Sequence, residues 1–237
     1  MDFNIISIVS FAIMILLNLI LKRFKYTPII LQIFSIILFV YKSYHYIIQN
    51  IQGNFLIPVE ISSISYFLIP IILTFKIKKL YKVASFFGIA AGLGFYLFYC
   101  VFGFAVRANF EVTDLLISIF SHSYLLTAGL QLMFTEKFEN QPKTIWITIL
   151  AMLCWAMAFY DFNMRGITFV YYIVKPTYLC IFSSNTLNFL LIVLFYAVVV
   201  TIFALVVKLF FVVNNKLHPL ETHQKEKVQS VKIAQKV

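Results

Sequence analysis

Charged residues are scarce in this chain of 237 residues, and acidic residues are scarcer than basic ones. Asp and Glu together number 9, charged residues of both signs make up 12%, and hydrophobic residues make up 62%. So little charge cannot cover the water-facing surface of a folded domain, which argues against a soluble protein. The composition is typical of a protein whose helices lie in a membrane.

Cysteine is also scarce. Cys100, Cys154 and Cys180 are the three in the chain, and all lie in or beside apolar segments. Their odd number and lack of paired spacing favour packing thiols over a disulfide framework. No Cys or His residues have the spacing of a zinc site, so we predict no metal site and no cofactor.

What the chain has in abundance is long apolar runs. Each approaches or exceeds the ~20 residues that cross the core of a bilayer, and the gaps between them are short. We predict an all-α, polytopic membrane bundle of seven transmembrane helices over residues 1–213, followed by a basic tail over residues 214–237. The seven runs are Ile5–Leu21, Ile29–His45, Val59–Phe75, Val83–Phe104, Leu115–Phe134, Ile145–Phe159 and Leu187–Val213.

Basic residues collect in alternate gaps between these runs. One side receives fifteen of them, the other side receives only Arg107, Arg165 and Lys175, and Lys42 lies within the second run. The positive-inside rule therefore predicts an N-terminus outside the cell and a cytoplasmic tail. The fifteen are Lys22, Arg23, Lys25, Lys76, Lys78, Lys79, Lys82, Lys137, Lys143, Lys208, Lys216, Lys225, Lys227, Lys232 and Lys236.

The net charge of +10 lies mostly in short loops beside the membrane. This placement favours contact with anionic lipid headgroups, and no basic face with interleaved aromatics indicates nucleic acid. We therefore expect membrane lipids as partners. The plasma membrane is the expected location, in a bacterium whose AT-rich genome accounts for the many Phe, Ile, Tyr and Lys residues.

Small residues recur at four-residue spacing in the fourth run, at Ala84, Gly88 and Gly92. Such a stripe allows another helix to approach closely. Packing inside the bundle is the simpler interpretation, and a homo-oligomer through this stripe is the alternative.

Polar side chains within the runs are expected to share the outer half of the membrane, because the topology places them near the outer ends. We expect the inner half to be nearly free of strongly polar groups. Shared depth predicts a cavity open to the outside, whereas long side chains at the interface can equally extend to the nearer surface. The candidates are Lys42, His45, Glu60, Ser62, Ser63, Asp114, His122, Asp161, Asn163 and Arg165.

His122 is the deepest of these candidates. It lies between Ser121 and Ser123, about two turns inside the fifth run, where it needs hydrogen-bond partners from other helices. Together with Glu60 and Ser62 it supplies an imidazole, an acid and a hydroxyl, the groups used to activate a nucleophile. A structural bond between helices is the alternative role for His122.

Three segments resemble the YwaF-like family of bacterial integral membrane proteins and, more distantly, eukaryotic acyltransferase relatives. Ile57-Pro58-Val59-Glu60-Ile61-Ser62-Ser63 stands where that family has Leu-Pro-Leu-His-x-Cys-Asp. Phe120-Ser121-His122-Ser123 is similar to its Leu-Ser-His-Gly segment. The stretch from Gly166 to Lys175-Pro176 has the length of its Gly-x-Asn-Tyr-x-x-Leu-x-x-Lys-Pro segment. The resemblance covers roughly residues 50–210.

This chain departs from the family pattern at several positions. Glu60, Ser62 and Ser63 replace the histidine, cysteine and aspartate, and Thr168 and Phe169 replace Asn and Tyr. In the eukaryotic relatives the cysteine is thought to carry an acyl group between phospholipids. The resemblance therefore implies Ser62 at the position of the nucleophile, although serine is a weaker nucleophile than cysteine at its free pKa.

Three functions from different classes follow, and the third is a structural or assembly protein whose polar residues only fix the packing of the helices. The first is acyl transfer or ester hydrolysis in the outer leaflet, with Ser62 as nucleophile, His122 as base and Glu60 orienting that base. The second is non-enzymatic binding or transport of an anionic headgroup or solute. Its expected ligand-binding residues are Lys42, His45, Asp161, Arg165 and Lys175.

Overall fold

The computed structural model describes residues 3–53, 56–102, 112–159, 179–182 and 184–219. Within these ranges the chain is helical and forms no strand, and all seven predicted runs coincide with a long helix. The elements are α1 (Phe3–Leu21), α2 (Thr27–Ile51), α3 (Ile61–Thr74), the 3-10 turn η1 (Lys78–Leu80), α4 (Tyr81–Phe102), α5 (Val112–Thr135), α6 (Lys143–Phe159) and α8 (Asn185–Leu217).

Four helical segments in the described part are long and apolar enough to cross a membrane. They are Thr27–Ile51, Lys78–Val101, Leu116–Thr135 and Asn185–Leu217. The apolar helices Ile8–Leu21, Ile61–Thr74 and Lys143–Phe159 are shorter. The all-helical architecture is thus confirmed, whereas seven crossings and their sidedness stay predictions.

The third helix begins later than its apolar run. The predicted run starts at Val59, but α3 starts only at Ile61, and Glu60 before it has an extended backbone with φ −82° and ψ 155°. The indole N–H of Trp155 on α6 donates to the Pro58 carbonyl at 2.8 Å. That carbonyl is therefore used in a bond to another helix, and the chain stays extended up to Glu60.

The last helix ends later than its apolar run. α8 continues to Leu217, so the domain boundary predicted between residues 213 and 214 lies within a helix. Asn214 is fully buried. Its side chain accepts from the backbone N–H of Phe138 at 2.9 Å and donates to the carbonyls of Met133 and Glu136 at 3.2 and 2.9 Å. Polar bonds to the α5–α6 loop thus extend the bundle past the apolar residues.

The stripe of small residues brings α4 against α5 at backbone distance. A Cβ at Gly88 would lie 2.6 Å from the carbonyl oxygen of Leu125, and one at Gly92 would lie 2.5 Å from Cβ of Leu126. Gly129 of α5 is the reciprocal position, where a Cβ would lie 2.6 Å from the Ile89 amide nitrogen. The close approach predicted for Gly88 and Gly92 is therefore made within one chain. Association of chains through Ala84, Gly88 and Gly92 stays a prediction.

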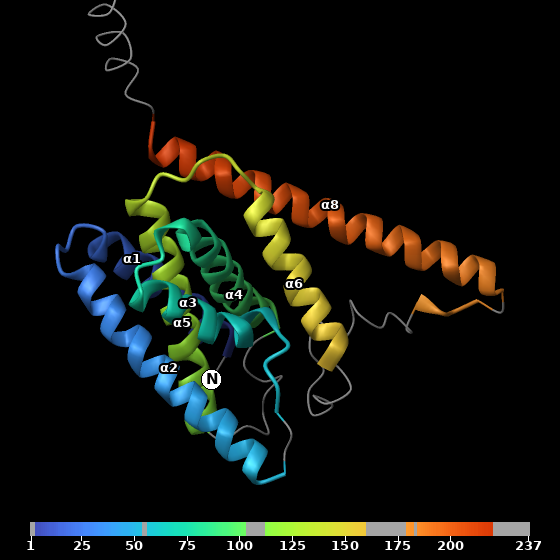
Figure 1. The fold of residues 1–237 in the computed structure, drawn as a ribbon, viewed down its shortest axis with the longest axis horizontal. Coiled ribbons are helices and arrows are strands. Elements are labelled where there is room, and N and C mark those ends of the chain that lie inside the picture. Colours follow the sequence, from blue (N-terminus) through green and yellow to red (C-terminus); the bar gives the residue numbers. More distant parts are fainter. Residues whose placement is uncertain (1–2, 54–55, 103–111, 160–178, 183, 220–237) are drawn as a thin grey trace, which may run out of the picture.

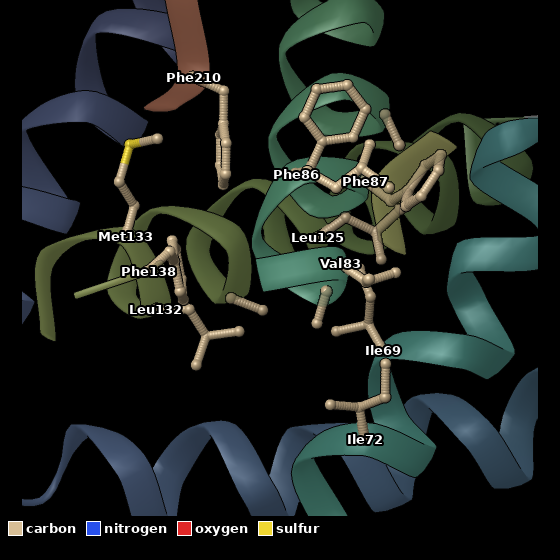
Figure 2. Packing of buried hydrophobic residues seen from close by; sticks show 14 of the residues in the cluster. Ile69, Ile72, Val83, Phe86, Phe87, Leu125, Leu132, Met133, Phe138 and Phe210 are labelled. Carbon is tan, nitrogen blue, oxygen red and sulfur yellow. The ribbon is translucent and has the colours of Figure 1, made fainter. Parts of the chain in front are cut away.

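The hydrophobic core lies around this helix pair. Figure 2 shows Ile69 and Ile72 of α3, Val83 and Phe86 of α4, and Phe210 of α8 among its labelled members. The Phe210 ring lies 5.5 Å from Phe86 and 5.7 Å from Phe138, measured between ring centroids. Aromatic contacts of this kind fix the C-terminal part of α8 on the bundle.

The helices alternate in direction, so the lysine-bearing loops meet at one end of the bundle. The α1–α2 loop, the α3–α4 loop and the end of α5 line a common cavity there. We call this the lysine-rich end. α8 reaches the same end with its C-terminus, beside the α5–α6 loop, and the rest of α8 extends past the bundle (Figure 1).

The α4–α5 contact predicts a contrast between two glycines. Gly92→Ala should lower the free energy of unfolding by about 1–3 kcal/mol, because its Cβ would overlap α5 and the helices must separate. At Gly94 of the same helix an added Cβ would meet no atom within 4 Å, so Gly94→Ala should leave the stability unchanged or raise it. Thermal unfolding of both variants in one detergent measures the difference, and equal melting temperatures would contradict the contact.

The shared end of the lysine-bearing loops predicts the orientation of the chain. A protease site placed after Val237 should resist protease added to intact cells and be cut once the membrane is opened, because positive loops are retained in the cytoplasm. Cleavage in intact cells, with a cytoplasmic reporter left uncut, would reverse the predicted orientation.

Candidate functional site

His122 lies inside the bundle on α5, with 8% of its surface exposed. Its Nδ1 atom is 2.8 Å from the Ser118 carbonyl oxygen, one helical turn before it. A carbonyl only accepts, so Nδ1 carries the proton and Nε2 is left as the acceptor. The Tyr66 hydroxyl of α3 lies 3.1 Å from each ring nitrogen, and with the proton on Nδ1 it donates to Nε2. Both ring nitrogens are thereby satisfied by groups of the same chain.

Rings from two further helices enclose this pair. Phe95 of α4 stacks on His122, with centroids 4.0 Å apart and planes within 12°. The Lys42 ammonium of α2 lies 4.3 Å from the centroid of the Tyr66 ring, a cation–π distance. Four helices, α2 to α5, thus contribute neighbouring side chains to one cluster, which we call the His122 cluster: Lys42, Tyr66, Phe95 and His122.

Ser62 and Glu60 lie at the start of α3, one turn from Tyr66. The Ser62 hydroxyl is 3.5 Å from a carboxylate oxygen of Glu60, the outer limit for a hydrogen bond. Ser63 hydrogen-bonds to Tyr46 of α2, and Glu60 is close enough to interact electrostatically with the same tyrosine. The structure therefore brings Ser62, Ser63 and Glu60 together, and a bond between Ser62 and His122 stays a prediction.

His45 belongs to the aromatic face of α2. Its ring stacks on Tyr41 at 6.3 Å and meets Tyr46 edge-on at 6.0 Å. Tyr46 in turn contacts Phe67 of α3 at 5.5 Å. His45 therefore lies next to Tyr46, the tyrosine that interacts with Ser63 and Glu60.

Three predicted binding residues, Asp161, Arg165 and Lys175, lie outside the described residues. In the part of the chain that the structure describes, no three His, Cys, Asp or Glu side chains gather in a way that would hold a metal ion.

Candidate residues of three predicted runs lie on helices that meet around Tyr66 and His122. α3 and α5 meet through the Tyr66–His122 bond, α2 joins them through Lys42 over the Tyr66 ring, and α4 joins them through Phe95. The cavity open to the outside stays a prediction. The sixth run, α6, contacts the segment before α3 through the hydrogen bond from Trp155 to Pro58. Sequence reasoning missed Tyr66 and Phe95, because single aromatic residues carry no positional signal in a chain with 27 Phe and 14 Tyr.

The lysine-rich end, which the predicted topology makes the inner one, is not nearly free of polar groups. At the lysine-rich end, Asn18 of α1 donates to the Thr127 hydroxyl of α5 at 3.2 Å. Gln131 donates to the backbone and side-chain oxygens of Asn18 at 2.8 and 3.1 Å. The expectation weighed ionisable groups and neglected amides, which are tolerated in an apolar bundle when they satisfy one another.

Comparison with protein-family models, with curated proteins and with solved structures found no match to this chain.

The bond between His122 and Tyr66 predicts a structural loss on substitution. His122→Ala should lower the free energy of unfolding by about 2–4 kcal/mol, because it removes a stacked ring and leaves the buried Tyr66 hydroxyl without its acceptor. Ser62→Ala, at a half-buried position, should change stability by no more than about 0.5 kcal/mol. Thermal melting in one detergent measures both. A His122→Ala protein as stable as its parent would rule out this role.

Proposed function

We propose that this chain is a non-enzymatic membrane protein that binds or transports an anionic headgroup or solute at the end opposite the lysine-rich one. The observation that carries the proposal is the state of His122. Nδ1 donates to Ser118, Nε2 accepts from Tyr66, and Phe95 covers one face of the ring. A base for Ser62 needs a nitrogen that is free to take its proton, so this arrangement favours a positioning role for His122 over catalysis.

Lys42 supplies the positive charge of the proposed site. It is half-buried on α2, and the Tyr66 ring, itself fixed by His122, lies beneath its ammonium group. An ionisable side chain within an apolar helix is costly, so it marks a functional position more often than a surface lysine does. The contacts from Lys42 to Tyr66 and from Tyr66 to His122 support a fixed cation as part of the proposed site.

The proposal also includes membership of the YwaF-like family, seven membrane crossings and a location in the plasma membrane of a bacterium. The three resembling sequence segments and the apolar helices support these points. Lys175 belongs to the proposed site through the third of these segments, and Asp161 and Arg165 belong to it through their place at the end of the sixth apolar run.

A second candidate, ester hydrolysis or acyl transfer, is favoured by the contact between Ser62 and Glu60. In this reaction the Ser62 hydroxyl attacks a lipid ester carbonyl and its proton passes to the Glu60 carboxylate. The departing alcohol takes that proton, and water or a second alcohol then accepts the acyl group. The 3.5 Å distance must shorten for this transfer to occur.

Local fluorescence tests binding at this end. The chain has two Trp, so a Trp146→Phe variant reports from Trp155 alone, which bonds to Pro58 just before Glu60. Brominated short-chain phosphatidylglycerol should quench Trp155 at lower concentrations than brominated phosphatidylcholine. Lys42→Gln should weaken the quenching at least fivefold, whereas Lys208→Gln on α8, an equal loss of charge, should not. Equal quenching by the two lipids would contradict an anion site here.

Lipid turnover distinguishes the two candidates. The purified parent protein should release no fatty acid from labelled phospholipid if it only binds. If the parent shows turnover that Ser62→Ala and Glu60→Gln both abolish, with the fold retained, the enzyme mechanism replaces the binding proposal.

A further inference from the structure

A cavity of about 470 Å³ opens at the lysine-rich end, far from the residues of the His122 cluster along each helix. Its walls come from the α1–α2 loop, the first turns of α2, the α3–α4 loop, the start of α4 and the last turns of α5. This volume falls within the ~300–1,000 Å³ of pockets that hold small ligands. Because helices begin and end around it, it lies at the depth where a bilayer presents its headgroups.

Three lysines from two separate loops line this cavity. Lys22 and Lys25 come from the α1–α2 loop and Lys76 from the α3–α4 loop, against a single acidic residue, Glu136. Aromatic rings hold two of the ammonium groups: Lys22 lies 5.1 Å from the centroid of Phe134, and Lys25 lies 4.8 Å from that of Tyr26. The cavity therefore has an excess of positive charge supplied by side chains that the fold itself brings together.

A buried amide oxygen adds a position for a hydroxyl group. Gln131 lines the cavity and is 3% exposed. Its nitrogen donates to two oxygens of Asn18, which fixes the orientation of the amide. Its oxygen is buried and has no hydrogen-bond donor among the described residues. Less than 1 Å² of this oxygen is exposed, so a ligand hydroxyl bonds to it once the side chains around it shift, and the bond would offset the cost of burying the oxygen.

The rest of the lining suits the part of a lipid next to its headgroup. Leu31, Leu73 and Leu132 form apolar wall between the lysines and the core. The exposed lysines thus match the phosphate of a lipid, and the leucines behind them match its glycerol esters and the start of its acyl chains. Basic pockets between transmembrane helices hold anionic headgroups in this way.

We propose that this cavity is a binding site for a phosphate group that carries a hydroxylated substituent, as in the headgroup of phosphatidylglycerol. Lys22, Lys25 and Lys76 contact the phosphate, and Gln131 accepts from a hydroxyl. The same chemistry is available from a soluble glycerol phosphate. The site is separate from the one proposed at Lys42 and does not depend on it.

A matched pair of multiple substitutions tests the cavity. The full chain is placed in nanodiscs of phosphatidylcholine, and binding of a fluorescent phosphatidylglycerol is measured by energy transfer and titrated. Replacing Lys22, Lys25 and Lys76 with Gln should weaken binding at least tenfold. The control replaces Lys78, Lys79 and Lys82, which carry the same charge in the α3–α4 loop and at the start of α4 but do not line the cavity. It should weaken binding less than twofold.

The two sources of phosphate are distinguished by competition. If a lipid occupies the site, glycerol phosphate at millimolar concentration should not displace the fluorescent lipid, and phosphatidylcholine should not compete. Displacement by glycerol phosphate would assign the site to the soluble compound. Equal weakening by the two triple substitutions, or equal affinity for phosphatidylcholine, would overturn the proposal, because the lysines would then act only as general surface charge.

Folding and the role of the amide are checked separately. Circular dichroism must show unchanged helix content in each variant, and replacement of the three lysines by Arg should keep binding within threefold. If the Gln triple variant fails to fold, the three single variants are titrated, since each side chain is exposed. Gln131→Met, which removes the accepting oxygen at similar volume, should weaken phosphatidylglycerol more than phosphatidic acid, which lacks the glycerol headgroup hydroxyls. Equal weakening would remove Gln131 from the site.

Discussion

The contact between the backbones of α4 and α5 is the constraint on which the rest of the structure depends. Gly88, Gly92 and Gly129 remove the side chains that would keep the two axes apart. Ser85 adds a hydrogen bond across the contact, from its hydroxyl to the Gly129 carbonyl at 2.8 Å. In lipid, where apolar surface gives helices little reason to associate, close packing and such bonds provide the attraction.

Both ends of the bundle are organised by this pair. Towards one end, α4 carries Phe95 and α5 carries His122, so the stacking of these two rings follows from the register that the glycines set. Towards the other end, α5 carries Gln131, which meets Asn18 of α1 beside the lysine-lined cavity. A shift of one helix along the other would disturb the polar contacts at both ends together.

Apolar runs predicted the positions of the helices well, because a long run without charge has few alternatives to a helix in a membrane. Helix ends were predicted less well, since they depend on single tertiary hydrogen bonds. The bond from Trp155 to Pro58 accompanies the later start of α3, and the bond between Asn214 and the α5–α6 loop accompanies the later end of α8. His122 was identified from its residue type and depth. Its partner Tyr66 was not identified. The rotation of α3 about its own axis relative to α5 decides which of the many aromatic residues faces His122, and one sequence does not determine that rotation.

The length of α8 has a consequence for the way the protein meets its membrane. Its 33 residues span about 50 Å, whereas the apolar core of a bilayer is about 30 Å thick. Such a helix must tilt strongly or extend beyond the core, and its inclination then varies with the thickness of the surrounding lipid. Among the described residues, the buried positions of α8 all lie in its C-terminal part, from Val207 to Asn214. Asn214 bonds to the carbonyl of Glu136, a residue that lines the lysine-bearing cavity. A change in bilayer thickness would therefore act as a mechanical load on the rim of that cavity.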